Sequence, residues 1–494
     1  MKKRVVVIGG GIAGLSAGVY AQKCGFDVTI LESHSIAGGN CTSWKRKGYL
    51  FEGGMHWLTG SAKKEPVYKI WHHMGALNDD VRVHYPEPFK EFIYKGTSIR
   101  LYRDANLTEK HLIELSPEDE KEIRLLCNRI RKVSPLVMPV ADLSGVKVTK
   151  WQFPPIKLLY HYLTANRMMK KSSKIPKEEY IKRFKHEGLR ELFRHLCAGK
   201  YSATWLYFSM GTQARGDGGF PEGGSLPFVG RIVKTFKNAG GKIIFNTKAD
   251  RVITENGKAI GVKVGDDIYP ADAVIVTADT MQMDHLFDTP PQAPWLDEMR
   301  KTAKPTMCTF VSLGINADLK KYPKDCIFKL DKPLKIATQE HNYLSISNYA
   351  NDSSYSPEGK AAVTMILISD SYDFWKKARE EGRYEEEKEK VAADVIAALT
   401  TQLPEIVDKV EVCDVATPLT YERYCANWRG SWMTMMAHTL KVRAYPAVVS
   451  NLKGVYFAGH RMRAPGGLPI AARSGRAAVQ YLCRDTKTLF VSEE

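Results

Sequence analysis

A glycine-rich turn near the start of the chain constrains its fold more than any other feature. Residues 4–8, Arg-Val-Val-Val-Ile, have the short, β-branched character of a buried parallel strand. The motif Gly9-x-Gly11-x-x-Gly14 follows at once, and residues 12–25 are predicted to form a helix that ends at a glycine. A second strand is predicted over residues 27–31. This order of strand, turn, helix and strand is the setting in which such a glycine motif binds a dinucleotide.

The residues around this turn have separate chemical tasks. The glycines permit a tight turn and let the backbone approach a pyrophosphate, while the helix N-terminus supplies unpaired N–H groups and positive potential. Glu32 stands at the end of the second predicted strand. A carboxylate there accepts hydrogen bonds from the hydroxyls of the adenosine ribose. We therefore expect a dinucleotide site at this end of the chain.

A second glycine doublet and the far end of the chain favour FAD over NAD. Gly38-Gly39 lies just beyond Glu32, where flavoproteins bring the backbone close to the phosphates and the ribityl chain. Near the C-terminus, Ala458-Gly459 is followed by Pro465-Gly466-Gly467. A helix predicted over residues 469–482 would direct its positive end at the flavin and stabilise negative charge on the reduced ring. Both ends of the chain are thus expected to hold one FAD.

The composition is that of an ordinary globular protein with a basic surface. Its 494 residues carry a net charge of +17, which favours an anionic partner such as a membrane surface or an acidic ligand. No nucleic-acid recognition module is present, so nucleic acid is not expected as a partner. The nine cysteines have no zinc spacing, which indicates reduced thiols, a cytoplasmic location and no metal site. No second glycine motif indicates a dedicated NAD(P)H domain, and the electron donor or acceptor stays open.

The middle of the chain alternates in character, which predicts two interleaved domains. Segments at 1–65, 216–290 and 445–494 are assigned to an FAD-binding domain, and 66–215 and 291–444 to a substrate-binding domain.

Residues 151–177 combine aromatic and methionine side chains with many lysines. This pattern is typical of a helix that dips into a bilayer with lysines toward anionic headgroups, although a solvated helical cap would share it. The protein could then be peripheral on the inner face of the membrane.

Further motifs lie between the two glycine-rich ends. They are the Phe-Pro-Glu-Gly-Gly-Ser turn at 220–225, the strand pair around Val252 and the stretch Ala-Thr-Pro-Leu-Thr-Tyr-Glu-Arg-Tyr at 416–424. Together with the ends, they resemble the superfamily of phytoene desaturases, carotenoid isomerases and retinol saturases along nearly the whole chain. Residues 48–57, Gly-Tyr-Leu-Phe-Glu-Gly-Gly-Met-His-Trp, are most similar to the retinol saturase and carotenoid isomerase branch.

This resemblance implies a fold of the α/β class. A Rossmann-type FAD-binding domain, of the glutathione reductase and amine oxidase kind, would be interleaved with an α+β substrate domain that carries a helical cap. It also implies an apolar, polyene-like small-molecule substrate reached from a membrane. Val252 would present its backbone to the adenine. The candidate cofactor contacts are Gly9, Gly11, Ile12, Ala13, Gly14, Glu32, Gly38, Gly39, Asn40, Val252, Gly459, His460, Gly467, Leu468 and Ile470.

Two positions depart from the family pattern. The family usually has Asp or Glu after its Tyr-x-Ala-Gly motif, whereas this chain has His460 and then Arg461. The residue after the first glycine doublet, often Arg in related oxidases, is Asn40. The contacts of these residues with the cofactor must therefore differ from those in the family. We expect this difference to affect the redox properties of the flavin more than its binding.

Three residues are candidates for catalysis. His56 comes first, because it follows the loop expected to contact the flavin and carries a titratable ring. A structural histidine is the alternative. Glu52 and Tyr424 are further candidates, with Trp428 and Trp432 expected to line an apolar channel.

These observations predict an FAD-dependent oxidoreductase that desaturates or saturates carbon–carbon bonds of a long apolar polyene or isoprenoid-type molecule. The alternative is a flavin isomerase or hydratase of polyenes or unsaturated fatty acids, without net redox change. A flavin amine oxidase shares the fold, but nothing in the sequence indicates an amine site. A non-catalytic prenyl-lipid escort protein would be expected to have lost flavin contacts.

Overall fold

Five parallel strands from distant parts of the chain form one sheet in the computed structural model, which describes residues 2–150, 156–196, 202–436, 444–463 and 466–492. Val5 and Val7 of the central strand pack on one face and Val6 and Ile8 on the other, so both faces are covered. That burial explains the uninterrupted β-branched run. The sheet order is β21 (Val455–Phe457), β13 (Ala273–Val276), β1 (Arg4–Ile8), β2 (Asp27–Leu31) and β9 (Lys242–Ile244).

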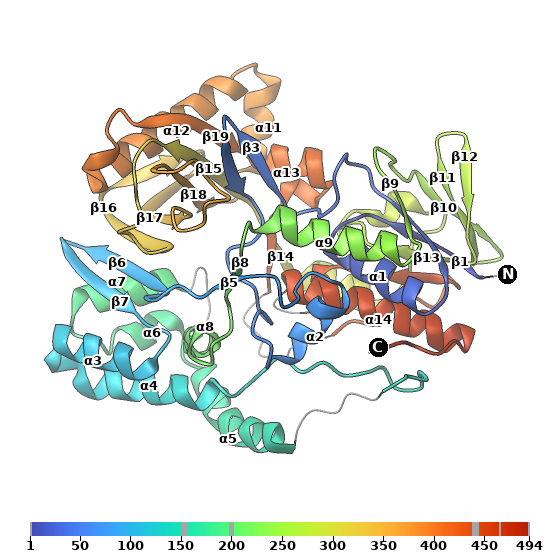
Figure 1. Ribbon diagram of the computed structural model, residues 1–494, viewed down its shortest axis with the longest axis horizontal. Coiled ribbons are helices and arrows are strands. Elements are labelled where there is room, and N and C mark those ends of the chain that lie inside the picture. The colour runs from blue at the N-terminus through green and yellow to red at the C-terminus, as the bar shows by residue number, and fades with distance from the viewer. Residues whose placement is uncertain (1, 151–155, 197–201, 437–443, 464–465, 493–494) are drawn as a thin grey trace.

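Helices α1 (Ile12–Lys23) and α14 (Leu468–Thr486) pack directly on each other beside this sheet (Figure 1). The Ser16 hydroxyl donates a hydrogen bond to the Ala472 carbonyl at 2.7 Å. A Cβ at Gly475 would lie 2.2 Å from the Ala13 carbonyl oxygen, so only glycine permits this approach. The first and last helices of the chain therefore form one unit, to which α9 (Ser225–Asn238) adds a further layer.

The opposite face of the five-stranded sheet is covered by a small antiparallel sheet. It consists of β10 (Arg251–Glu255), β11 (Lys258–Val264) and β12 (Asp267–Pro270). Val252 and Val262 share a core with Val6 and Val274.

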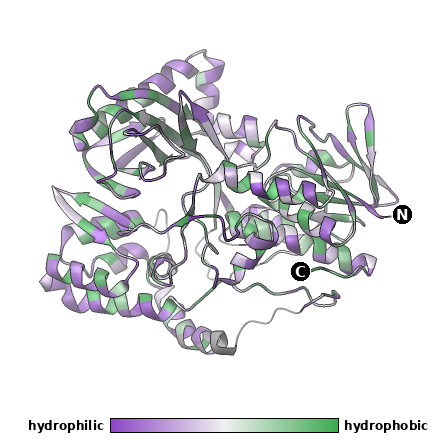
Figure 2. Ribbon diagram, viewed as in Figure 1, coloured by the Kyte–Doolittle hydropathy of each residue, from purple (hydrophilic) through white to green (hydrophobic). Residues whose placement is uncertain are grey.

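A second large sheet has seven strands and is mostly antiparallel, with one parallel pair between β6 and β16. Its order is β19 (Val410–Ala416), β15 (Cys308–Ile315), β18 (Ala361–Ile368), β17 (Gln339–Asn348), β16 (Asp325–Ile336), β6 (Lys90–Tyr94) and β7 (Thr97–Leu101). Helices α11 (Tyr372–Glu380) and α12 (Tyr384–Gln402) lie over one face of it (Figure 1). Strands β15 and β18 of this sheet are largely apolar, as their green colour in Figure 2 indicates.

A group of helices forms a cap beside this sheet and has its own core of residues such as Leu126, Phe184 and Tyr207. The cap consists of α3 (Ala105–Leu115), α4 (Glu120–Val133), α5 (Ile156–Ser172), α6 (Lys177–Ile181), α7 (Glu187–Leu196) and α8 (Ala203–Ala214). In the segment 151–177, residues 151–155 lie outside the described residues. Among the helices that the structure describes, none combines the length and the apolar character needed to cross a bilayer.

Two helices assigned to the substrate domain from the sequence pack elsewhere. In α2 (Pro66–His73), Trp71 is fully buried and packs edge-on against Phe228 in the core beside α1. In α10 (Pro294–Thr302), Leu296 joins the core beneath the small sheet. Both helices therefore extend the nucleotide-binding part of the molecule beyond the boundaries predicted at residues 65 and 290.

The contact between α1 and α14 yields a test with a matched control. Gly475→Ala should destabilise the protein by about 1–3 kcal/mol, because the new methyl group collides with the Ala13 carbonyl. Gly230→Ala, in α9, should stabilise it by up to about 1 kcal/mol, since a Cβ there meets no atom within 4 Å. Urea-induced unfolding measures both. Equal stability of the two variants would contradict the close packing.

Candidate active site

A cavity of about 1770 Å³ extends from the N-terminal glycine turn to the seven-stranded sheet and the helical cap. Residues of both chain ends line one part of it, and residues of β16, β17, β18 and α8 line the other. The two parts are continuous. A molecule bound along the glycine turn would therefore share one space with a second molecule bound against the sheet.

The glycine turn lies at one end of this cavity. Of the predicted cofactor contacts in this turn, Gly9, Gly11, Ile12 and Ala13 line the cavity, whereas Gly14 does not. A Cβ at Gly14 would lie 1.9 Å from the Gly9 carbonyl oxygen, so this glycine permits the close packing of helix on strand. The backbone N–H groups at the start of α1 thus border a space that a pyrophosphate can fill.

Glu32 lines the same end of the cavity. Its Oε2 accepts a hydrogen bond from the Gly10 backbone N–H at 2.6 Å, and Oε1 accepts one from the His34 N–H at 2.8 Å. The carboxylate is therefore fixed by the turn itself and faces the space where a ribose would lie.

The second glycine doublet and the start of α14 meet further along the cavity. Gly38, Gly39, Gly459, Gly467, Leu468 and Ile470 all line it, together with Asn40 and His460. A Cβ at Gly459 would meet no atom within 4 Å, and one at Gly467 would meet only the Pro469 ring at 3.8 Å. The backbone is thus open on the side that a flavin would occupy, and the residues present fit FAD.

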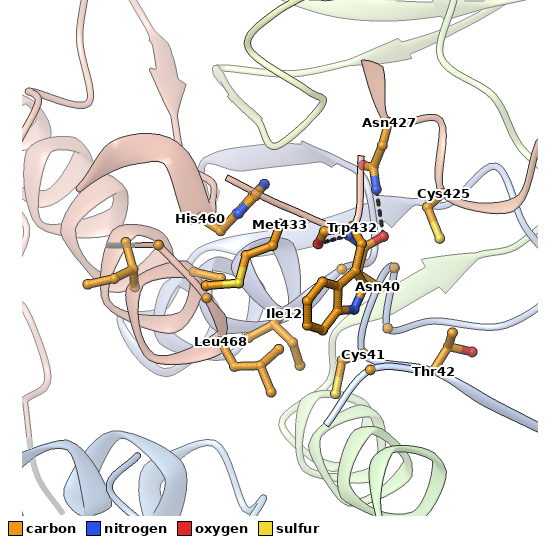
Figure 3. A pocket seen from close by; sticks show the side chains of 18 of the residues that line it. Ile12, Asn40, Cys41, Thr42, Cys425, Asn427, Trp432, Met433, His460 and Leu468 are labelled. Carbon is orange, nitrogen blue, oxygen red and sulfur yellow. Dashed lines mark hydrogen bonds between the residues drawn. The ribbon is translucent and has the colours of Figure 1, made fainter. Parts of the chain in front are cut away.

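Asn40 holds a loop over this part of the cavity. Its side-chain amide donates to the Trp432 carbonyl at 2.8 Å, and its Oδ1 accepts a hydrogen bond from the Asn427 amide at 2.6 Å (Figure 3). Related oxidases often have Arg at this position. In this chain the shorter Asn40 side chain instead anchors residues 427–432.

The two basic residues that follow Gly459 differ in their electrostatic state. Arg461 is buried, forms an ion pair with Asp279, and donates hydrogen bonds to the Thr434 and Ser431 hydroxyls at 2.8 and 2.7 Å. Arg461 does not line the cavity itself, and its charge is compensated by Asp279, which does. Burial, reinforced by the neighbouring Arg461, lowers the pKa of His460 to about 3. His460 therefore presents a neutral ring to the cavity.

The structure does not support the prediction that the Val252 backbone contacts the adenine, because the residue does not line the cavity. Its side chain is 1% exposed and packs into the core beneath the small sheet. The segment just before β10 lines it instead, through Thr247, Lys248 and Ala249. The sequence motif was correctly located, but the residue that faces the cavity lies three positions earlier.

Glu52 does not line the cavity either, so its geometry does not support catalysis. At the end of β4 (Tyr49–Glu52), it is fully buried and accepts five hydrogen bonds. The donors are the Gly54, Met55 and Ser225 N–H groups and the Ser225 and Tyr355 hydroxyls, at 2.5–3.0 Å. Burial raises the pKa of Glu52, although the donors oppose this shift. Glu52 joins the loop before His56 to the start of α9.

Tyr424 lines the cavity at its ribose end rather than near His56. Its ring meets that of His34 edge-on, with centroids 5.1 Å apart, and the residue is 44% exposed. It lies in α13 (Pro418–Cys425). This position does not support the catalytic role predicted for Tyr424.

His56 does line the cavity, where the glycine-doublet loop meets the seven-stranded sheet. Its ring centroid lies 5.5 Å from that of Trp432 and 6.3 Å from that of Phe310. Both ring nitrogens are buried and have no hydrogen-bond partner among the described residues. Burial lowers the pKa of His56 to about 3, with nearby Lys324 acting in the same direction. His56 therefore offers a neutral imidazole to whatever occupies this space.

Comparison with known proteins identifies the family. A sequence profile described as "Flavin containing amine oxidoreductase" matches residues 12–483. The chain belongs to this family. It is therefore an FAD-dependent oxidoreductase, and the predicted Rossmann-type FAD-binding fold with a separate substrate region is confirmed.

Individual relatives are more distant. The chain is 24% identical to all-trans-retinol 13,14-reductase of Danio rerio over 86% of this chain and 76% of the relative. It is 25% identical to prolycopene isomerase 1, chloroplastic, of an Oncidium hybrid cultivar over 97% and 84%, respectively. Among solved structures, putrescine oxidase bound to putrescine superposes with a TM-score of 0.62 at 15% identity, covering 98% and 99% of the two chains. The predicted superfamily is confirmed.

Sequence patterns do not indicate several further residues that line the cavity. The segment after α4 contributes Leu136, Val137 and Met138, α8 contributes Trp205 and Phe208, and the seven-stranded sheet contributes Lys90, Asp325, Ile327, Ser345, Ser347 and Ile366. The alternation of Ser345 and Ser347 with buried Leu344 and Ile346 was the available signal for a strand with one polar face.

The structural role of Glu52 can be tested by Glu52→Gln. The amide nitrogen would face donors instead of an acceptor, so we expect a loss of stability of about 1–3 kcal/mol. The FAD content and turnover of the folded fraction should stay unchanged, and the exposed Glu358→Gln serves as the control. Urea unfolding followed by tryptophan fluorescence measures the first quantity and a turnover assay the second. Full stability with lost turnover would instead restore the catalytic role.

Proposed function

We propose that this protein transfers hydride between its flavin and carbon–carbon bonds of a long apolar substrate of the polyene or isoprenoid type, in the direction of desaturation or saturation. The observation that carries the proposal is the cavity that continues from the flavin-contacting residues into a space between sheet and cap. Its lining there includes Leu136, Val137, Trp205, Phe208, Ile327 and Ile366. Apolar walls of this kind favour a hydrocarbon chain.

FAD supplies the hydride acceptor or donor when bound. The chain's own residues orient the substrate and exclude water. Asn40 anchors the 427–432 loop, which keeps Trp432 beside His56. Phe310 packs against both rings. His56 is neutral, and its ring has no hydrogen-bond partner among the described residues. It can donate one hydrogen bond and accept another, which would fix the substrate in one orientation.

Two other reactions on this scaffold remain alternatives. A flavin isomerase or hydratase would use the same apolar cavity without net redox change, and the similarity to a prolycopene isomerase supports it. An amine oxidase would need a site for a cationic or amine group. The cavity's acids on the seven-stranded sheet are already engaged, Asp325 by Lys324 and Asp414 by Arg46, which disfavours that reaction. A non-catalytic prenyl-lipid escort is disfavoured by the retained flavin contacts.

The test is an anaerobic titration of the purified holoprotein with retinoids, carotenoids and unsaturated lipids. We expect one class to change the flavin absorbance, and His56→Ala to slow that change about 10- to 100-fold without loss of FAD. Because burial lowers the pKa of His56 to about 3, the rate should show no His56 ionisation near pH 6.5. His341→Ala, outside the cavity, is the control. Product isomerisation or hydration without flavin bleaching would select the alternative.

We further propose peripheral association with the inner face of a membrane through α5. Tyr160 and Leu163 of this helix are 66% and 64% exposed, and Lys170 and Lys171 lie in its last turn. Exposed apolar side chains next to lysines fit an interface with anionic lipids.

Liposome co-sedimentation tests this association. The protein should bind vesicles that contain anionic lipid more strongly than neutral ones, and added salt should weaken the binding. The double variant Tyr160→Ser/Leu163→Ser should bind several-fold more weakly, whereas Leu489→Ser, a similarly exposed position far along the chain, should not. Salt-insensitive binding, or none, would refute the proposal.

A further inference from the structure

The face of the seven-stranded sheet that borders the cavity carries an unbroken row of polar residues. Asp325 pairs with Ser347, Ser347 with Thr364, Thr364 with Ser312, and Ser312 with Asp414. Lys90 extends the row, because the residue after it, Glu91, pairs with the residue after Asp325. We call these six residues the polar row. All except Ser312 line the cavity.

The neighbouring row on the same face is mostly apolar. Residues two positions away along the strands include Ile327, Ile366 and Ala416, which line the cavity, and Phe310, which pairs with the last two. Ser345, which pairs with Ile327, is the polar exception in this row. Because side chains two apart in a strand share a face, the substrate meets a polar band beside an apolar band. A purely hydrocarbon substrate has no polar group that could interact with the polar band.

The charges in the polar row are compensated at all positions but one. Asp325 accepts a hydrogen bond from the Ser347 hydroxyl at 3.0 Å and lies 3.7 Å from the Lys324 ammonium. Asp414 accepts a hydrogen bond from the Arg46 guanidinium at 2.9 Å. Lys90, by contrast, makes no hydrogen bond or ion pair within the part of the chain that the structure describes. Asp325 attracts it at longer range, but this one carboxylate faces two ammonium groups, Lys324 and Lys90, so one positive charge is left in excess.

A second polar group beside the row, the His56 ring, also lacks a hydrogen-bond partner. Both ring nitrogens of His56 are buried and unpaired among the described residues, and His56 borders the same space. Lys324 donates to the His56 carbonyl at 3.1 Å, which ties the histidine to the Asp325 end of the row. Covering an ammonium and an imidazole with hydrocarbon alone would be costly, because neither would regain the hydrogen bonds it loses with water.

We propose that the substrate is an apolar chain with a terminal carboxylate, which the Lys90 ammonium binds while the chain lies along the apolar row. This inference rests on the proposed function and narrows its substrate class to unsaturated or polyene acids. A carboxylate balances the one uncompensated charge of the row and offers a lone pair to His56. The hydroxyl groups of Ser347 and Thr364, which lie next in the row, provide a polar surface beside the bound carboxylate.

Equilibrium binding tests this without any turnover. The probes are cis-parinaric acid, a polyene fatty acid that fluoresces when buried, and its methyl ester, each titrated into the FAD-loaded protein. The acid should bind at least about tenfold more tightly than the ester, as expected for a hydrogen-bonded charge pair. Lys90→Met should remove that preference and leave the ester unchanged. Lys90→Arg should retain most of it, and the exposed Lys332→Met should behave like the native protein.

Other outcomes would overturn the inference. Equal binding of acid and ester, no saturable binding of the acid, or equal weakening of both by Lys90→Met would each contradict it. Retention of the preference in Lys90→Met but its loss in Arg473→Met would place the carboxylate at the α14 side of the cavity, where Arg463 and Arg473 lie. Acid binding as expected without any flavin-dependent conversion would refute the proposed function alone. Conversion of a hydrocarbon with no effect of Lys90→Met would refute this inference alone.

Discussion

The contact between the first and the last helix of the chain is the constraint on which the rest of the molecule depends. Gly475 lets α14 approach the Ala13 carbonyl, and Ser16 holds the Ala472 carbonyl. This contact places the start of α14 beside the glycine turn that precedes α1. The cofactor site therefore exists only when both chain ends have met, and everything between them is free to form a separate sheet and cap.

That arrangement explains how one cavity acquires two chemical characters. The cofactor part is mainly backbone and glycine, where close approach matters more than side-chain chemistry. The other part is lined by side chains from five strands of the seven-stranded sheet and by the cap, and the alternation along the strands divides the sheet face into a polar and a mostly apolar row. His56 lies at the junction, tied to one part by the loop after Glu52 and to the other by Lys324.

Local sequence patterns were enough to predict the cofactor end but not the substrate end. The glycines and Glu32 act through turns and helix ends, which short motifs encode. Val252 itself does not line the cavity, because the segment that does, residues 247–249, ends just before the strand of Val252 begins. Glu52 and Tyr424 both lie in segments close to the cavity. Tertiary packing, however, buries Glu52 against the start of α9 and places the Tyr424 ring against His34. The polar row joins residues from 90 to 414, and only strand register brings them together.

The electrostatic state of the cavity narrows the chemistry further. Burial keeps His56 and His460 neutral, and Asp279 compensates Arg461, whereas the guanidinium groups of Arg463 and Arg473 line the α14 side of the cavity. Neutral, desolvated histidines are poorly suited to moving protons, but a desolvated site is well suited to aligning a carbon–hydrogen bond for hydride transfer. On the sheet face, the excess positive charge lies at the Lys90 end of the polar row, where Lys90 and Lys324 share the carboxylate of Asp325. Specificity for one end of the substrate and reactivity along its chain would then reside in different residues, which can change independently of each other.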